Sequence, residues 1–221
     1  MVGLKKQAVA ILLAAGEGSR LGGDKLFTEI DGRPMIERTL RCYRKAETVE
    51  DIVIVIPPGS AARFAHLKSP TQHLVENPDP SRGMISSIRA GLESGWTHER
   101  HFLIAPADMP FVPSEIVDRL VRTFSVRRCK VALPAYKGLG GHPGVFHRDL
   151  RKDFFLLGDT SGTREILFRY KQETFRLNVP EPDICFDVDT PEHLEMAADP
   201  GRRWACVELR ADARREGQLG V

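Results

Sequence analysis

The sequence of 221 residues lacks long apolar runs, paired cysteines and a strong net charge, and each absence excludes a class of protein. No apolar run is long enough to cross a bilayer, and residues 1–7 lack the apolar core of a secretory signal. The four cysteines stand far apart, without a CxxC pair or the spacing of a zinc site, so we expect reduced thiols and a cytoplasmic protein. A formal net charge of +2 gives no general attraction to nucleic acid or to a membrane surface, and we predict neither as a partner.

Short apolar runs alternate with amphipathic segments along most of the chain. Three runs bounded by turn residues are typical of strands buried on both faces: residues 8–15, 51–56 and 101–105. Apolar residues at helical spacing predict helices between and after them, at residues 34–46, 84–94 and 113–124. The alternation predicts an α/β fold: a doubly wound, mostly parallel sheet with helices on both faces, in a single domain.

Beyond residue 130 the alternation is looser. We expect further extended segments and helices at residues 130–134, 144–146, 149–157, 162–170 and 174–179. A last strand is expected at residues 185–188, before a helix at 192–198 with Thr190 as its N-cap and Pro191 in its first turn. We assign residues 8–198 to the domain and residues 199–221 to a basic C-terminal extension, solvated or in contact with a partner.

A glycine-rich loop follows the first predicted strand, in the stretch AVAILLAAGEGSRLGGDK. Small residues let the backbone approach a ligand closely and turn N–H groups toward an anion. Arg20 and Lys25 add charges suited to phosphate oxygens. The loop therefore predicts a phosphate site, and the alternative is an ordinary strand-to-helix turn with two solvated cations.

Carboxylates follow two of the predicted strands. Asp108 stands in the run APADMP, and Asp187 and Asp189 stand in CFDVDTPEHLE. Ligands bind at the carboxyl ends of strands in open α/β sheets, and Mg²⁺ takes one or two protein carboxylates there, completed by water and substrate phosphates. We expect Asp108 and Asp189 to bind Mg²⁺. Asp108 as a turn residue is the alternative, and for Asp187 a metal ligand and a helix cap are equally favoured.

A polar set surrounds the start of the helix expected at residue 84: Asn77, Gly83, Ser86 and Ser87. An amide and helix-opening hydroxyl groups offer the donors and acceptors that the edge of a nucleobase needs. A capping motif would explain the same residues equally well.

His142, Asp159 and Arg164 stand in the less regular second half. His142 lies in the glycine-rich run GLGGHPGVF, where it could donate to an acceptor phosphate or act as an acid or base. Asp159 and Arg164 could form a simple ion pair between a loop and a helix, or the arginine could face an anionic substrate.

Together these motifs resemble the MobA-like nucleoside-triphosphate transferases. The family signature, LAAG or LAGG followed by x-S-x-R-x-G and then a lysine, resembles residues 13–25, where Gly18 stands at the serine position. Gly83 and Met84 with Ser87 also match, as do Asp-x-Pro at 108–110, Gly-His-Pro at 141–143 and Asp-Val-Asp-Thr-Pro-Glu at 187–192. The matches run in family order from about residue 8 to residue 198.

The resemblance implies a Rossmann-like nucleotide-diphospho-sugar transferase fold and a reaction in which an acceptor phosphate attacks the α-phosphorus of an NTP and expels pyrophosphate. The catalytic residues would be Arg20, Lys25 and Asp108, with Asp108 and Asp189 holding Mg²⁺. The nucleotide would contact Leu13, Ala14, Ala15, Gly16, Gly18, Ser19, Asn77, Gly83, Ser86 and Ser87. The acceptor would contact His142, Asp159 and Arg164.

Within the family, LAAG with a GHP turn looks most like the cytidylyltransferases that make molybdopterin cytosine dinucleotide, whereas the guanylyl branch tends to carry LAGG. Ala15 therefore favours CTP over GTP. The resemblance implies molybdopterin as the acceptor and a molybdoenzyme or its chaperone as a possible partner. The chain departs from that branch at residues 158–164, which are one residue longer than Gly-Asp-x-Gly-Ala-Arg, and in its basic C-terminal tail.

Other functions are less compatible with the sequence. A nicotinamide dehydrogenase should carry an acidic residue at the end of its second strand, where Pro57 and Pro58 stand, and a P-loop NTPase needs Ser or Thr where Leu26 follows Lys25. A sugar-phosphate nucleotidylyltransferase of the same fold remains the alternative enzyme. A non-catalytic nucleotide-binding chaperone or regulator of a molybdoenzyme is the alternative of another class.

Overall fold

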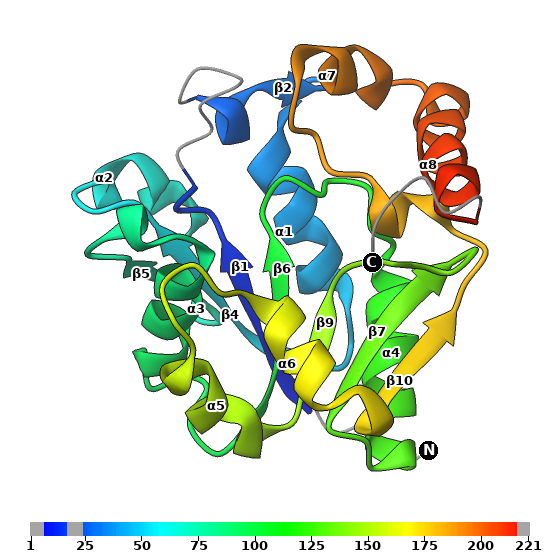
Figure 1. Ribbon diagram of the computed structural model, residues 1–221. Coiled ribbons are helices and arrows are strands. Elements are labelled where there is room, and N and C mark those ends of the chain that lie inside the picture. Colours follow the sequence, from blue (N-terminus) through cyan, green and yellow to red (C-terminus); the bar gives the residue numbers. More distant parts are fainter. Residues whose placement is uncertain (1–6, 17–23, 216–221) are drawn as a thin grey trace.

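A mixed sheet forms the centre of the protein (Figure 1). The computed structural model describes residues 7–16 and 24–215, and within them eight strands follow the order β10-β7-β9-β6-β1-β4-β5, with β8 paired to β7. Their bounds are β1 Ala8–Leu13, β4 Val49–Ile56, β5 Gln72–Glu76, β6 His101–Pro106, β7 Val131–Tyr136, β8 Leu139–Gly140, β9 Gly144–Phe146 and β10 Thr174–Asn178. The pairs β1–β4, β1–β6, β4–β5 and β7–β10 are parallel, whereas β8 and β9 pair antiparallel with their neighbours. The predicted single-domain, mostly parallel α/β fold is confirmed.

Helices cover both faces of this sheet because the strands bury both faces. Alternate residues of β1 belong to different apolar clusters: Ala8, Ala10 and Leu12 pack on one side, and Val9 and Ile11 on the other. Helices α1 (Met35–Lys45) and α4 (Ser114–Arg127) lie behind the sheet in Figure 1, and α3 (Met84–Glu93), α5 (Arg151–Leu156) and α6 (Thr163–Arg169) lie in front. None of the described helices is long and apolar enough to cross a membrane.

Short elements fill the connections. The segment after the glycine-rich loop forms a 3₁₀ turn, η2 (Lys25–Phe27), and a small hairpin of β2 (Glu29–Ile30) and β3 (Arg33–Pro34). The remaining ones are α2 (Ala61–Phe64), η3 (Ala65–Leu67), η4 (Pro80–Arg82), η5 (Arg148–Leu150) and η6 (Lys171–Glu173). The hairpin and β8 are too short for apolar periodicity to reveal them.

The predicted strand at residues 185–188 is wrong. The 3₁₀ turn η7 (Pro182–Cys185) occupies its start, and the following residues belong to no strand of the sheet. Phe186 and Val188 alternate as strand residues do, but both are buried in a third apolar cluster with Val207 and Ala211. The apolar residues of this segment therefore do face one side, but they pack against the two helices that follow in the chain and not within the sheet.

The expectation that the tail is a solvated or partner-contacting extension is wrong for its described part. Residues 199–215 continue from α7 (Pro191–Ala197) into helix α8 (Pro200–Arg215), seen at the upper right of Figure 1. Val207 and Ala211 are fully buried, and the guanidinium of Arg203 is buried as well. The helix covers the third cluster and is part of the folded core. The stretch contains too few apolar residues for the sequence to predict this burial.

Candidate active site

The carboxyl ends of the three central strands are tied together at one edge of the sheet. Leu13 lies opposite Val55 of β4 and opposite Pro106 of β6. Just beyond, the Ala14 N–H donates to the Val55 carbonyl at 2.8 Å, and the Ala107 N–H donates to the Leu13 carbonyl at 3.1 Å. The glycine-rich loop and the turn that carries Asp108 therefore leave the sheet side by side, as expected for the ligand-binding edge of an α/β fold.

The start of the predicted phosphate loop lies against this edge. Ala14 and Ala15 are buried, and Gly16 is exposed. Of the other residues predicted there, Gly18, Ser19 and Arg20 lie outside the described residues.

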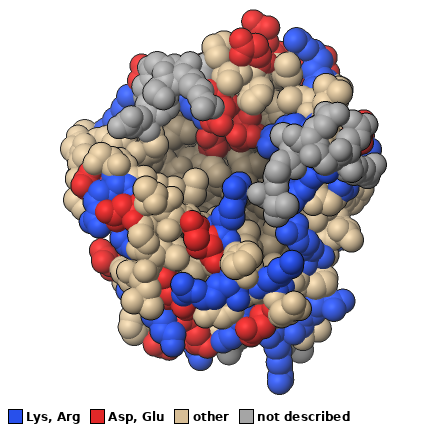
Figure 2. Space-filling model, in the orientation of Figure 1, with Lys and Arg blue, Asp and Glu red and all other residues tan. Residues whose placement is uncertain are grey.

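Lys25 brings two distant carboxylates together. Its side chain is only 9% exposed, and its Nζ donates to Asp108 Oδ2 at 2.6 Å and also to Asp189 Oδ1. Figure 2 shows a hollow over the carboxyl ends of the central strands, with acidic side chains above it and basic side chains below. The residues predicted to hold a metal thus share one ammonium group at the edge of the sheet.

The charges of this trio are not balanced. Burial raises the pKa of Asp108, against the opposing effect of the Lys25 charge, and the charge of Asp189 raises it further. Burial disfavours the charge on Lys25 too, but the charge and hydrogen bond of Asp108 and the contact with Asp189 raise its pKa above the ordinary value. Two carboxylates facing one ammonium leave a net negative charge that favours a cation.

One carboxylate oxygen of this trio has no partner among the described residues. Asp108 Oδ1 is buried and makes no hydrogen bond to any described residue, which is costly for a carboxylate oxygen unless a cation or donor meets it. The described residues hold no cluster of three or more His, Cys, Asp or Glu side chains that could bind a metal alone. Two carboxylates with an open oxygen fit a hard cation such as Mg²⁺, which takes its other ligands from water and phosphates.

The acidic segment is held against the Asp108 turn. The Val188 N–H donates to the Asp108 carbonyl at 3.0 Å, and the Asp189 N–H donates to Nδ1 of His193 at 3.3 Å. Thr190 caps α7 by accepting from the His193 N–H, which confirms the predicted N-cap. Since Thr190 is the cap, Asp187 is not; its carboxylate lies 3.4 Å from Arg210 instead.

Asn77, Ser86 and Ser87 are brought together as predicted, but their polar groups bond to one another. Asn77 is 1% exposed, and its Nδ2 donates to both serine hydroxyl groups, at 2.8 and 2.9 Å. Its Oδ1 accepts from the Asp79 N–H, and Ser86 donates to the Gly83 carbonyl. In this arrangement the set fixes the loop before α3. Because the Asn77 amide already donates to both serines, it has little capacity left to donate to a ligand.

Asp159 pairs with Arg82 and Arg89, and the alternative of an Asp159–Arg164 ion pair is wrong. Arg82 donates to both carboxylate oxygens, at 3.1 and 2.8 Å, and Arg89 Nη1 lies 3.4 Å from Oδ1. Gly83 has a φ of +81°, and a Cβ there would lie 3.0 Å from the Asp159 carbonyl oxygen. Gly83 is thus explained by a turn and a close approach, and Arg164 is exposed on α6.

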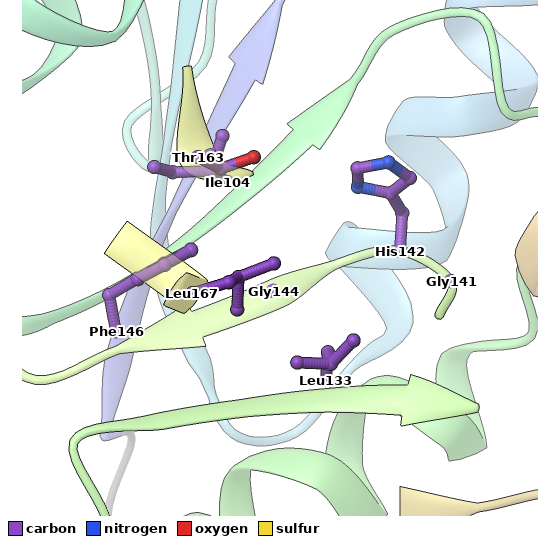
Figure 3. A pocket seen from close by; sticks show the side chains of 8 residues that line it. All are labelled: Ile104, Leu133, Gly141, His142, Gly144, Phe146, Thr163 and Leu167. Atoms are coloured by element: carbon purple, nitrogen blue, oxygen red, sulfur yellow. The ribbon is translucent and has the colours of Figure 1, made fainter. Parts of the chain in front are cut away.

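His142 lies beside a small apolar cavity whose lining residues come from β6, β7, β9 and α6 (Figure 3). A volume of about 40 Å³ has room for ordered water and not for a whole acceptor molecule. Burial lowers the pKa of His142 to about 4, so the ring is neutral at physiological pH. It can donate one N–H to an anion, but it brings no positive charge.

Gly141 allows this loop to approach η7 closely, because it has no side chain. A Cβ at Gly141 would lie 2.6 Å from both Cδ1 and the carbonyl oxygen of Ile184, and the neighbouring His142 N–H donates to that carbonyl at 2.9 Å. We expect Gly141→Ala to lower the free energy of unfolding by about 1–3 kcal/mol, as overpacking does. Urea unfolding measures this, with Gly16→Ala as the control because a Cβ there meets no described residue within 4 Å. Equal unfolding midpoints for the two variants would contradict the close approach.

Two neutral histidines make the free energy of unfolding depend on pH. Burial lowers the pKa of His142 and, together with the nearby His147 and Arg148, that of His101, each to about 4 from an ordinary 6.5. The unfolded chain then binds protons that the folded chain does not, so stability is lost as the pH falls from about 6.5 toward 4. We expect His142→Gln to remove about 1–2 kcal/mol of the fall in unfolding free energy between pH 7 and pH 5. An unchanged pH dependence in that variant would show that His142 is not the cause.

Comparisons with known proteins agree with the fold and the motifs. Residues 10–174 match the MobA-like NTP transferase domain. A molybdenum cofactor guanylyltransferase from Rhodopseudomonas palustris (strain HaA2) is 30% identical over 200 residues, 85% of this chain and 89% of that protein. The crystal structure of Rv0371c from Mycobacterium tuberculosis H37Rv has a TM-score of 0.75 at 21% identity, over 88% of this chain and 98% of that one. A complex of Rv0371C with manganese has a TM-score of 0.70 at 18% identity, over 87% and 98% of the two chains.

A cytidyl enzyme shares the fold as well. The 4-diphosphocytidyl-2C-methyl-D-erythritol synthase from Anaerococcus prevotii DSM 20548 has a TM-score of 0.71 at 17% identity, over 90% of this chain and 97% of that one. The chain belongs to the MobA-like NTP transferase family, is a nucleotidyltransferase of that family, and has the Rossmann-like nucleotide-diphospho-sugar transferase fold. Its place in the cytidylyl branch stays a prediction, because the Rhodopseudomonas relative is named a guanylyltransferase.

Proposed function

We propose that this member of the MobA-like NTP transferase family moves a nucleoside monophosphate from an NTP to a phosphorylated small molecule and releases pyrophosphate. The observation that carries the proposal is the trio of Lys25, Asp108 and Asp189 beside the start of a glycine-rich loop, in which Asp108 Oδ1 meets no donor from the described residues. A triphosphate bound by that loop would lie next to both the ammonium group and the carboxylates.

Asp108 and Asp189 would hold the divalent cation, for which Mg²⁺ is our choice. When bound, the cation neutralises phosphate charge and orients the triphosphate. Asp189 is favoured over Asp187 as the second ligand, because Asp189 faces Lys25 and Asp187 faces Arg210. The fixed backbone at Val188 and Asp108 keeps the two carboxylates together before substrate arrives.

The reaction is an in-line displacement at the α-phosphorus. An oxygen of the acceptor phosphate forms a bond to that phosphorus, the bond to the bridging oxygen of the β-phosphate breaks, and pyrophosphate leaves with the electron pair. Lys25 would stabilise the charge that develops on phosphate oxygens, and we propose the same role for Arg20. Positioning and charge neutralisation account for most of the rate in such transfers, and a buried ammonium group provides both.

We propose CTP as the nucleotide and molybdopterin as the acceptor. Ala15 supports CTP through the LAAG motif, whereas the name of the Rhodopseudomonas relative supports GTP. A base bound at the start of α3 would contact Ser86 and Ser87, which hydrogen bonds from Asn77 hold in place. A neutral His142 would donate to the acceptor, Arg164 would supply positive charge, and Asp159 would order the loop between them.

Release of pyrophosphate tests the proposal. CTP, GTP, UTP and ATP are each supplied with Mg²⁺, with and without molybdopterin. Release that requires both CTP and molybdopterin is expected, and release with GTP and molybdopterin would keep the reaction and change the base. Release with an NTP and a sugar phosphate supplied in place of molybdopterin, and not with molybdopterin, would favour the sugar-phosphate alternative. Nucleotide binding without release for any pair would overturn the enzymatic proposal and favour a chaperone or regulator.

A further inference from the structure

Helix α8 holds the segment that carries Asp187 and Asp189. This segment belongs to no strand, so no ladder of backbone hydrogen bonds fixes it to the sheet. Its backbone bonds to the Asp108 turn at a single N–H, that of Val188. The His142 N–H also donates to the Ile184 carbonyl, and contacts between α8 and residues 183–187 add further attachments.

The first of these contacts is buried. Arg203 donates through Nε to Asp183 Oδ1 at 3.0 Å and through Nη1 to the Ala197 carbonyl at 2.6 Å. Its guanidinium carbon lies 3.7 Å from the centre of the Phe111 ring. The arginine is 6% exposed, and these contacts attach the start of the segment to the core.

The second contact lies at the site. Arg210 is two helical turns beyond Arg203, on the same side of α8, with the buried Val207 between them. Its Nη1 donates to the Cys185 carbonyl at 3.1 Å and lies 3.4 Å from Asp187 Oδ1. One guanidinium group thus joins the backbone before the acidic pair to the first carboxylate of the pair.

The two carboxylates of the pair interact unfavourably. Asp187 and Asp189 are like charges two residues apart on one short segment, and the guanidinium of Arg210 lies beside the first of them. Without Arg210, Asp187 would lose its cationic partner, and repulsion would act on the short segment between the two residues. The orientation of Asp189 toward Lys25 depends on that segment.

We propose that Arg210 is a positioning residue for the cation site, which it serves by holding the Cys185 carbonyl and the Asp187 carboxylate in place and so keeping Asp189 facing Lys25. The proposal rests on the proposed function, in which Asp108 and Asp189 bind a divalent cation. Arg210 lies on the C-terminal helix α8, beyond residue 174, where the match to the family domain ends.

The sign of the effect distinguishes positioning from simple charge. Removing a positive charge near a cation site strengthens cation binding if nothing else changes. Loss of positioning weakens it. Arg210→Gln is therefore expected to weaken the binding of Mn²⁺ about fivefold to tenfold, and Arg210→Lys, which keeps the charge beside Asp187, about twofold.

The test is a titration of the full chain with Mn²⁺, in which the electron paramagnetic resonance signal reports the free ion. Arg202→Gln on the same helix is the control, since its side chain is exposed, and it should bind Mn²⁺ like the wild type. Urea unfolding tests whether a variant acts by loosening helix α8 or only by displacing a carboxylate. Arg203→Gln should loosen the helix and lower the unfolding midpoint, whereas Arg210→Gln should have the same midpoint as Arg202→Gln.

Each outcome decides something. Weaker binding in Arg210→Gln, partly restored in Arg210→Lys, supports positioning. Equal or tighter binding in Arg210→Gln, with loss of binding in Asp108→Asn, overturns the role of Arg210 and keeps the cation site. Wild-type binding in Asp108→Asn, or no binding by the wild type, overturns the cation site and the role of Arg210 with it.

Discussion

Asp108→Asn is expected to slow nucleotidyl transfer about a thousandfold, because it removes a carboxylate that would hold the cation and orient the triphosphate. The asparagine keeps the shape of the side chain, so its effect reports charge and ligation. The prediction follows from the buried Asp108 Oδ1, which meets no described donor and is available as a ligand. Steady-state rates of pyrophosphate release, at saturating NTP and acceptor, measure the change.

The same variant is expected to be at least as stable as the wild type. Burial raises the pKa of Asp108, which means that the folded state disfavours its charge, and a neutral amide removes that penalty. Asp149→Asn is the control, an exposed carboxylate on a surface turn that pairs with Lys130. A parallel fall in activity and in unfolding midpoint for Asp108→Asn would show a structural role in place of a catalytic one.

Lys25→Met is expected to reduce turnover about a hundredfold to a thousandfold and also to destabilise the fold. Two carboxylates would lose the ammonium group between them, and breaking a buried ion pair typically costs about 3–5 kcal/mol. Because a divalent cation can take over this neutralisation, Mg²⁺ should raise the unfolding midpoint of Lys25→Met more than that of the wild type. Urea unfolding with and without Mg²⁺ measures the difference.

A double variant provides the control for Lys25. If the penalty comes from facing carboxylates, Lys25→Met combined with Asp108→Asn should regain most of the lost stability while remaining inactive. Additive losses in the double variant would mean that Lys25 stabilises the protein through packing, and its contact with Asp108 would then have no special role.

The central sheet could be predicted from the sequence because its strands are buried on both faces. The runs that form β1, β4 and β6 are continuous, apolar and bounded by turn residues, so their identity did not depend on distant partners. The same logic placed Asp108 at the carboxyl edge. Thr190 with Pro191 is a local helix start, and local chemistry was sufficient to predict it.

The outer parts depended on contacts that no local pattern contains. Residues 185–188 have a strand-like alternation, but they pair with no strand of the described sheet and pack instead with buried residues of α7 and α8. Helix α8 buries an arginine as well as apolar residues, so the sequence of its buried face does not show the apolar periodicity that predicts a packed helix. Asp159 pairs with Arg82 and Arg89, which lie 77 and 70 residues away in the sequence. Proximity in the sequence suggested Arg164 as its partner, and this was wrong.

The most direct measurement of the central claim is the fate of labelled phosphorus. CTP labelled at the α-phosphate or at the γ-phosphate is supplied with Mg²⁺ and molybdopterin, and the products are separated. Nucleotidyl transfer predicts that the α-label appears in the acceptor and the γ-label in pyrophosphate, with both lost in Asp108→Asn. The γ-label in the acceptor, or no transfer of either label despite bound nucleotide, would contradict it.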